Sequence, residues 1–208
     1  MATLRRLPPG RAGRMWLTRR LAIADRAAEL LDQKVRVLRQ QTERFRLLAE
    51  RTGAEWTRSC REAEDWSLRA ALVGGQAALR AATVHGGARV VLNFGTTMGV
   101  PHPSDARCLL PDAADPVTSG PATMSAVLAH RQALDAAVQH AVALAGLRAL
   151  EHELAATRRR RRAITDRLIP QLEDALAAAV LRLEETERAE GVRLRCALRA
   201  QQPQDGAP

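Results

Sequence analysis

The sequence contains few aromatic residues and few cysteines, and each shortage excludes a class of protein. Phe and Trp make up 2% of the 208 residues and Tyr is absent. A large globular core, which draws much of its buried area from aromatic rings, is therefore not expected. Cys60, Cys108 and Cys196 are an odd number without CxxC spacing. They predict neither a disulfide framework nor a zinc site, and they fit reduced thiols in a cytoplasmic protein.

Long apolar runs and catalytic motifs are also missing. No segment approaches the ~18 uncharged apolar residues that a membrane-spanning helix requires. The basic N-terminus lacks the apolar stretch and cleavage site of a secretory signal. No phosphate-binding GxxxxGK[ST] loop is present, and the histidines neither pair at i,i+4 nor cluster with cysteine. We therefore predict no direct membrane insertion, no catalytic residue, no metal and no cofactor.

Lysine is almost absent, although the chain is strongly basic. Lys34 is the only lysine, so the basic side of the net charge of +9 comes almost entirely from arginine. Residues 1–20 and 191–200 both carry arginines without any acid. Positive charge at two separated ends indicates an anionic partner, such as nucleic acid, a membrane surface or an acidic protein cavity.

What the chain does contain is a hydrophobic ladder that starts near the N-terminus. Apolar residues recur mainly at alternating spacings of four and three, the 3.5-residue period of a coiled coil. The ladder comprises Leu17, Leu21, Ala24, Ala28, Leu31, Val35, Leu38, Thr42, Phe45, Ala49, Trp56, Ala63, Trp66, Ala70 and Val73. With Gly74–Gly75 as its end, this ladder predicts one long helix over residues 14–73.

A second helical region fills the last third of the chain and is predicted over residues 123–200. Its apolar positions include Leu150, Leu154, Ile164, Leu168, Leu172, Leu176, Ala179 and Leu183. Pro170 lies inside this pattern, removes one backbone hydrogen bond and predicts a kink. We expect residues 1–13 to form an irregular basic N-terminus and residues 201–208 to form a flexible polar tail.

Residues 74–122 separate the two long helices and differ from them in composition. Arg89–Phe94 contains β-branched residues, Gly95–Gly99 has the character of a turn, and Arg107–Leu110 supplies a return strand. These signals predict a β-hairpin over residues 88–110, preceded by a short helix. Several prolines exclude a helix from the rest of this stretch.

Folding the chain back near residue 100 pairs the two long helices. The predicted fold is mainly α: a long antiparallel two-helix coiled coil of the N- and C-terminal helices, with a small middle domain of short helix plus β-hairpin. Arg14 is then expected close to about Arg195, so that the two arginine-rich ends meet at one tip. The middle domain is expected at the other tip. A rod of this kind is more typical of a mechanical or scaffolding protein than of an enzyme.

Three ordered segments carry a family pattern. They comprise Pro9, Gly10, Arg11, Leu21, Ala24, Arg26, Leu30, Leu31 and Lys34; then Asn93 and Met98–Pro101; then Arg159, Arg160, Ala163, Ile169, Pro170, Leu172, Glu173, Leu183, Glu184, Glu187, Arg188, Glu190, Arg193 and Leu194. In this order the segments resemble the D subunit of the V/A-type rotary ATPases. The chain departs from the family pattern at Asp32, where lysine is usual, and at Arg161, where valine is usual.

The resemblance implies a non-catalytic central-stalk subunit. In this family the coiled coil is a rotor shaft whose two termini enter the catalytic hexamer. The shaft pairs with the small F subunit of the stalk, and its other end reaches the membrane ring through a connecting subunit. Its rotation couples ATP hydrolysis or synthesis to ion translocation. The expected location is cytoplasmic, at the periphery of a membrane complex.

Candidate interaction residues follow from charge placement and from the family match. The residues assigned to the hexamer-facing tip are Arg11, Arg14, Arg19, Arg193 and Arg195, and those assigned to a stalk-partner contact are Arg158, Arg159 and Arg160. The hairpin and its turn are assigned to Asn93, Met98, Gly99, Val100 and Pro101. The shaft kink is assigned to Pro170. The arginine run fits either a solvated helix surface or an acidic neighbour. Trp56 and Trp66 are expected to pack in the seam, and Trp16 lies outside it.

The high net charge supports a second hypothesis, a basic coiled coil that binds nucleic acid or acts as a scaffold. Such a protein should carry a continuous basic stripe. Acids such as Glu29, Glu43 and Glu62 interrupt the arginines here. The rotor shaft is therefore preferred, and no nucleic-acid partner is predicted.

Overall fold

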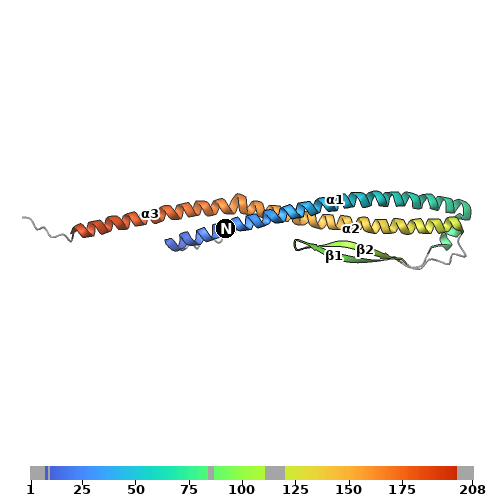
Figure 1. Ribbon diagram of the computed structural model, residues 1–208, viewed down its shortest axis with the longest axis horizontal. Coiled ribbons are helices and arrows are strands. Elements are labelled where there is room, and N and C mark those ends of the chain that lie inside the picture. The colour runs from blue at the N-terminus through green and yellow to red at the C-terminus, as the bar shows by residue number, and fades with distance from the viewer. Residues whose placement is uncertain (1–7, 9, 84–86, 111–119, 201–208) are drawn as a thin grey trace, which may run out of the picture. The chain divides into compact units, whose positions relative to one another are not determined.

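The structure is a computed structural model that describes residues 8, 10–83, 87–110 and 120–200. The elements are α1 (Arg11–Ala81), β1 (Arg89–Thr97), β2 (Val100–Leu109), α2 (Pro121–Ala163), a π-helical turn η3 (Ile164–Leu168) and α3 (Ile169–Ala200) (Figure 1). The predicted mainly α fold, with two long helical regions around a central antiparallel hairpin, is confirmed. Of the expected irregular N-terminus, residues 1–7 and 9 lie outside the described residues, as does the tail 201–208.

The chain divides into two compact units. Unit 1 contains residues 1–33 and 158–208, and unit 2 contains residues 34–157. Each unit is built on an antiparallel helix pair. In unit 2 the pair is α1 from Lys34 onward with α2 up to Thr157. In unit 1 it is the start of α1 with the end of α2, η3 and α3.

The heptad ladder is the packed face of α1 along most of its length. The ladder residues from Leu17 to Ala49 are all buried or half-buried, and so are Ala63, Trp66 and Ala70. Trp56 is 41% exposed and stacks on the ring of His140, with 5.6 Å between ring centroids. Val73 is 79% exposed, which corrects its placement in the seam.

Val73 leaves the seam because α1 turns immediately after it. Gly75 has φ 69° and ψ 175°, outside the helical region, although the flanking residues are helical. A positive φ is accessible to glycine because it lacks a Cβ. The helix break predicted at Gly74–Gly75 is therefore present, and residues 76–81 form a short helical continuation with a new direction.

Glycine and alanine let the two helices of unit 2 approach closely. A Cβ on Gly146 of α2 would overlap Cε1 of the Phe45 ring on α1. Elsewhere the contact between the helices is made by alanines, with Ala63 against Ala129 and Ala133. A larger cluster of Val35, Leu38, Leu150 and Leu154 lies near the other end of this pair. One part-buried ion pair, Lys34 with Glu153 at 2.8 Å, adjoins it.

The β-hairpin lies along the side of this helix pair (Figure 1). Its turn residues Met98 and Gly99 have φ 51° and 80°, the double positive φ of a two-residue type I′ turn. Ala106 of β2 packs against Val138 and Val142 of α2. The expectation of a middle domain confined to a tip is therefore wrong for the hairpin: alternate β2 residues are apolar enough to be buried against α2.

In unit 1 the helices pack around Leu17, Ala24 and Leu172, all almost fully buried. Trp16 also packs against this cluster, so its expected position outside the seam is corrected. At the end of the pair, Arg14 shares a groove with residues 180–187 of α3. The expected pairing of Arg14 with about Arg195 is wrong, because a reversal centred near residue 100 places residue 14 opposite about residue 186.

The Gly146–Phe45 contact yields a stability prediction. Gly146→Ala improves helix propensity by about 1 kcal/mol, but its methyl group overlaps the Phe45 ring, and overpacking costs about 1–3 kcal/mol. We expect a net loss of stability, measured as a lower midpoint in urea unfolding. Gly191→Ala in α3 is the matched control, because a Cβ there meets nothing within 4 Å. It should raise the midpoint, and a rise for both variants would contradict the prediction.

Candidate functional site

Three of the predicted tip arginines share one groove in unit 1. Arg11, Arg14 and Arg19 of α1 line one side, and Glu184 and Glu187 of α3 lie among the residues opposite. The groove has a volume of about 720 Å³. Because both signs of charge are present, the groove is less cationic than the sequence of residues 1–20 alone predicts.

Arg11 makes the one ion pair that closes this groove among the described residues. Its Nη2 donates to Oε1 of Glu187 at 2.9 Å. This hydrogen bond, together with the negative charges of Glu187 and Glu190, raises the pKa of Arg11. Both side chains are at least half exposed, so the pair contributes little to stability. Its effect is to orient Arg11 across the helix pair.

The other two tip arginines are not brought into this groove. Arg193 and Arg195 are exposed on α3, and Nε of Arg195 donates to the carbonyl of Gly191 within the same helix. At 1.5 Å per residue, Arg195 lies about 12 Å further along α3 than Glu187. α1 begins at Arg11, opposite Glu187. The end of α3 therefore carries its arginines beyond the start of α1.

The arginine run in α2 includes a half-buried member, Arg161, that faces the neighbouring helix. Arg158, Arg159 and Arg160 are exposed. Arg161 is half-buried, and its Nη1 donates to Oδ1 of Asp32 at 2.5 Å. Asp32 and Arg161 are both departures from the family pattern. The carboxylate on α1 therefore pairs with the guanidinium on α2.

The predicted hairpin residues have two different environments. Val100 packs against the Val35–Leu38–Leu150–Leu154 cluster, whereas Met98 is 46% exposed at the turn. Asn93 adjoins a β-bulge: it pairs with Asp105 while Phe94 pairs with Pro103, which leaves Ser104 as the extra residue. Ser104 Oγ donates to the carbonyl of Asn93.

The strands also expose an unusual amount of apolar surface. The large apolar residues that are at least 43% exposed are Val90, Val91, Leu92, Phe94, Met98 and Leu109. Clustered apolar side chains on one small hairpin mark an interaction surface more often than scattered ones do. Sequence reasoning selected only Met98 of this group, because the exposure of a strand face depends on how the hairpin docks.

Pro170, the predicted kink, is exposed and lies in the first turn of α3, directly after η3. The backbone N–H of Ile169 donates to the carbonyl of Ile164, five residues earlier. The helix is therefore widened by a π-helical turn just before the proline. Sequence reasoning identified the location of the irregularity but not this form.

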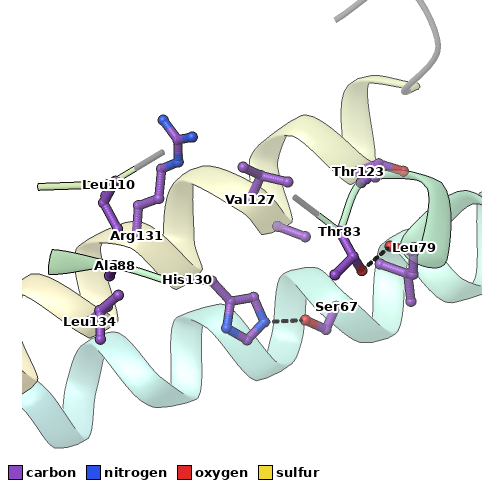
Figure 2. Close-up of a pocket in the computed structure, with 12 residues that line it drawn as sticks. Ser67, Leu79, Thr83, Ala88, Leu110, Thr123, Val127, His130, Arg131 and Leu134 are labelled. Atoms are coloured by element: carbon purple, nitrogen blue, oxygen red, sulfur yellow. Dashed lines mark hydrogen bonds between the residues drawn. The ribbon is translucent and has the colours of Figure 1, made fainter. Parts of the chain in front are cut away.

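A pocket of about 500 Å³ lies in unit 2, near the base of the hairpin (Figure 2). Its walls are mostly apolar, with Leu79, Val127 and Leu134 among them. The ring of His130 on α2 points to Ser67 on α1, with 2.7 Å between Nε2 and Oγ. No carboxylate is among the described lining residues, so this Ser–His pair lacks the acid of a hydrolase triad.

Two further histidines of unit 2 also have hydroxyl partners. His140 on α2 contacts Thr52 on α1, and His102 on β2 contacts Thr97 on β1 at 2.9 Å. His102 is 6% exposed and meets the edge of Phe45, with 5.0 Å between ring centroids. Sequence spacing could not reveal these pairs, because each joins residues of two different elements.

A comparison with family models decides what kind of chain this is. The model of the ATP synthase D subunit matches residues 15–199. The chain belongs to the family of ATP synthase D subunits. It is therefore a stalk subunit of a rotary ATPase complex, in a family whose members are generally non-catalytic. A search of curated proteins found no match.

Two further observations concern the described residues. None of the helices in these ranges combines the length and apolar character that crossing a bilayer requires. The same residues contain no group of three or more His, Cys, Asp or Glu side chains placed to hold a metal ion. The exposed charged and apolar features described above are the arginine groove, the arginine run and the exposed apolar residues of the hairpin.

The contacts of Phe45 yield a prediction about the hairpin. Phe45 touches both Gly146 and His102, and Phe→Ala substitutions in cores cost roughly 3 kcal/mol. Phe45→Ala should destabilise unit 2 and accelerate hydrogen exchange of the β2 amides, because the hairpin loses its aromatic contact with α1. Phe94→Ala, at an exposed strand position, should change stability by less than about 0.5 kcal/mol. Unchanged β2 exchange in Phe45→Ala would refute this account of docking.

Proposed function

We propose that this chain is the central-stalk rotor shaft of a V/A-type ATPase or ATP synthase. The family match over residues 15–199 is the observation that carries the proposal. In this role the subunit couples ATP hydrolysis or synthesis in the catalytic hexamer to ion translocation through the membrane ring. It performs no chemistry itself, and it acts in the cytoplasm at the periphery of the membrane complex.

The helix pairing supports this role physically. A shaft must transmit torque, and a single helix bends and twists more easily than two helices packed along their length. In unit 2 the paired part of α1 runs from Lys34 to Ala70, about 55 Å at 1.5 Å per residue. Small side chains such as Ala63 and Gly146 keep the two backbones close. Close packing makes this pair a suitable torque-bearing element.

The arginine groove and the end of α3 are the proposed contact with the catalytic hexamer. Arg193 and Arg195 extend past the start of α1, and Arg11 is held across the pair by Glu187. Exposed guanidinium groups are solvated and make no apolar anchor. They can therefore attract an acidic cavity and still slide within it.

The exposed apolar residues of the hairpin, which lie on both of its sides, are the proposed site for the small F subunit of the stalk. Phe94 is 67% exposed beside Leu92 and Val90, an arrangement that a partner surface would cover. The exposed arginines 158–160 offer a further contact to an acidic stalk partner. The stalk-to-ring connecting subunit completes the proposed set of partners.

The alternative of a nucleic-acid-binding coiled coil is less favoured by the charge pattern. Besides Arg11, several arginines are paired with acids: Arg46 with Glu43 and Glu151, Arg58 with Glu55, Arg161 with Asp32, and Arg188 with Glu184. A phosphate backbone needs uncompensated positive charge along a groove or stripe. Paired charges of this kind give no such stripe.

Replacing the tip arginines tests the hexamer contact. The triple variant Arg11→Ala, Arg193→Ala, Arg195→Ala should lose at least tenfold in ATP-driven ion pumping, because the end of the shaft loses its attraction to the hexamer. It should also be recovered with the catalytic subunits in lower yield. Pumping by reconstituted complexes and the yield of copurified catalytic subunits are the measurements.

The control for this triple variant removes the same charge elsewhere. Arg44, Arg51 and Arg80 are exposed on α1 in unit 2, and their replacement by Ala should leave pumping and copurification within twofold of the parent. Equal losses in both triples would mean that net charge, and not the tip, is responsible. Failure of the parent chain to copurify with ATPase subunits at all would overturn the rotor proposal.

The hairpin contact is tested by a polar substitution at its most exposed aromatic residue. Phe94→Ser should weaken binding of the F subunit by roughly tenfold, since a buried Phe contributes about 1.5–3 kcal/mol of hydrophobic free energy. Isothermal titration with the purified F subunit measures this. Leu181→Ser, on α3 and 60% exposed, is the matched control and should bind normally. Normal binding by both variants would move the proposed contact away from the hairpin.

A further inference from the structure

Along η3 and α3, the spacing between the buried positions of unit 1 exceeds a regular heptad pattern by one residue. Up to Leu168 the inward positions alternate regularly, with Arg161, Ile164 and Leu168 at steps of three and four. A step of three is due next and would reach Gln171, which is exposed. The inward positions instead resume one residue late, at Leu172, Leu176, Ala179 and Leu183.

The π-helical turn lies where this extra residue must be absorbed. η3 covers Ile164–Leu168, and its hydrogen bond from Ile169 N–H to Ile164 O encloses one residue more than an α-helical turn does. The widened turn allows Ile164, Leu168 and Ile169 to pack together on the Leu17–Ala24–Leu172 cluster. The three residues between Ile164 and Leu168 are exposed.

Pro170 limits where the widened turn can lie. In a continuous α-helix residue 170 would donate to the carbonyl of Asp166, but proline has no N–H and its ring clashes with that carbonyl. A widened turn immediately before the proline relieves the clash. Two independent features, the late seam and the proline, therefore favour a π-helical turn at the same place.

Without the π-helical turn, α3 would be rotated about its own axis. Removing one residue's worth of winding rotates the following helix by about 100° and shifts it by about 1.5 Å. Gln171 would then replace Leu172 on the packed face, and Ala175, which already packs on this cluster, would take the position of Leu176. Leu172 is 2% exposed. The rotation would therefore remove the most deeply buried side chain of α3 from the cluster.

We propose that Ile164–Leu168 is a torsional joint built into unit 1. This turn accommodates the extra residue and sets the rotation of α3 about its axis relative to α1. It also concentrates the torsional flexibility of the helix pair in one turn. Helix on either side has regular hydrogen bonds and resists twist. In a rotor shaft, which is the proposed function, such a joint takes up twist between the two ends of unit 1 while Leu172 stays seated.

Deleting Asp166 tests the joint directly in the full-length chain. Asp166 is exposed within η3, and its loss places Leu172 ten residues after Arg161, the separation that steps of three, four and three give in a continuous α-helix. We expect hydrogen exchange of peptides covering residues 164–172 to slow at least tenfold, and Tm to rise by roughly 2–4 °C. Faster exchange, a lower Tm or failure to fold would overturn the proposal, since each means that the residue is not surplus.

Two matched variants separate the surplus residue from other causes. Deletion of Asp25, an exposed acid of α1 in the same unit, breaks a regular seam and should lower Tm by several degrees. Pro170→Ala restores the missing N–H but leaves the extra residue, so local exchange should stay within threefold of the parent. Slow exchange in Pro170→Ala equal to that of the Asp166 deletion would assign the turn to the proline alone and overturn the joint. These measurements need no partner subunit, so they stand apart from the test of the rotor proposal.

Discussion

Close approach of long helices through small side chains is the constraint on which the rest of the structure depends. Alanines and Gly146 occupy the face where α1 meets α2, and Phe45 fills the space that Gly146 leaves. Each alanine buries little apolar area, at about 25 cal/mol per Å², so no single contact dominates. The pair gains its stability from length and from a few large side chains, Leu38 and Leu150 among them. A helix pair built this way is slender and depends on regular spacing.

That dependence on spacing explains where the irregular features occur. Gly75 ends the straight part of α1, and η3 absorbs a residue that would otherwise put α3 out of phase. Polar contacts across the helices include Lys34 with Glu153, Asp32 with Arg161, and Ser67 with His130. They fix which residues face each other along a seam whose alanines are nearly interchangeable. In the proposed rotor role, such a fixed register would serve a mechanical purpose.

Much of the fold could be predicted because hydrophobic periodicity and helix-breaking glycine and proline residues are local properties of the sequence. The 3.5-residue ladder from Leu17 to Ala49 is packed as predicted, the break at Gly74–Gly75 is present, and the hairpin covers nearly the predicted residues. The predictions that were wrong concern relations between distant segments. Val73 is exposed, Trp16 is packed, and Arg14 lies beside residues 180–187 and not near Arg195. The assignments of particular arginines and hairpin residues to partners stay predictions.

The sequence by itself determined the helices, their ends, the hairpin and the family, since these follow from spacing, glycine and proline chemistry, and residues in fixed order along one chain. Only the tertiary structure decided that the hairpin lies against α2, that Asp32 pairs with Arg161, and that Ile164–Leu168 forms a π-helical turn. Each of these depends on which side chains from separate elements meet. A linear pattern fixes the face that a residue occupies, whereas the partner on that face is set by packing in three dimensions.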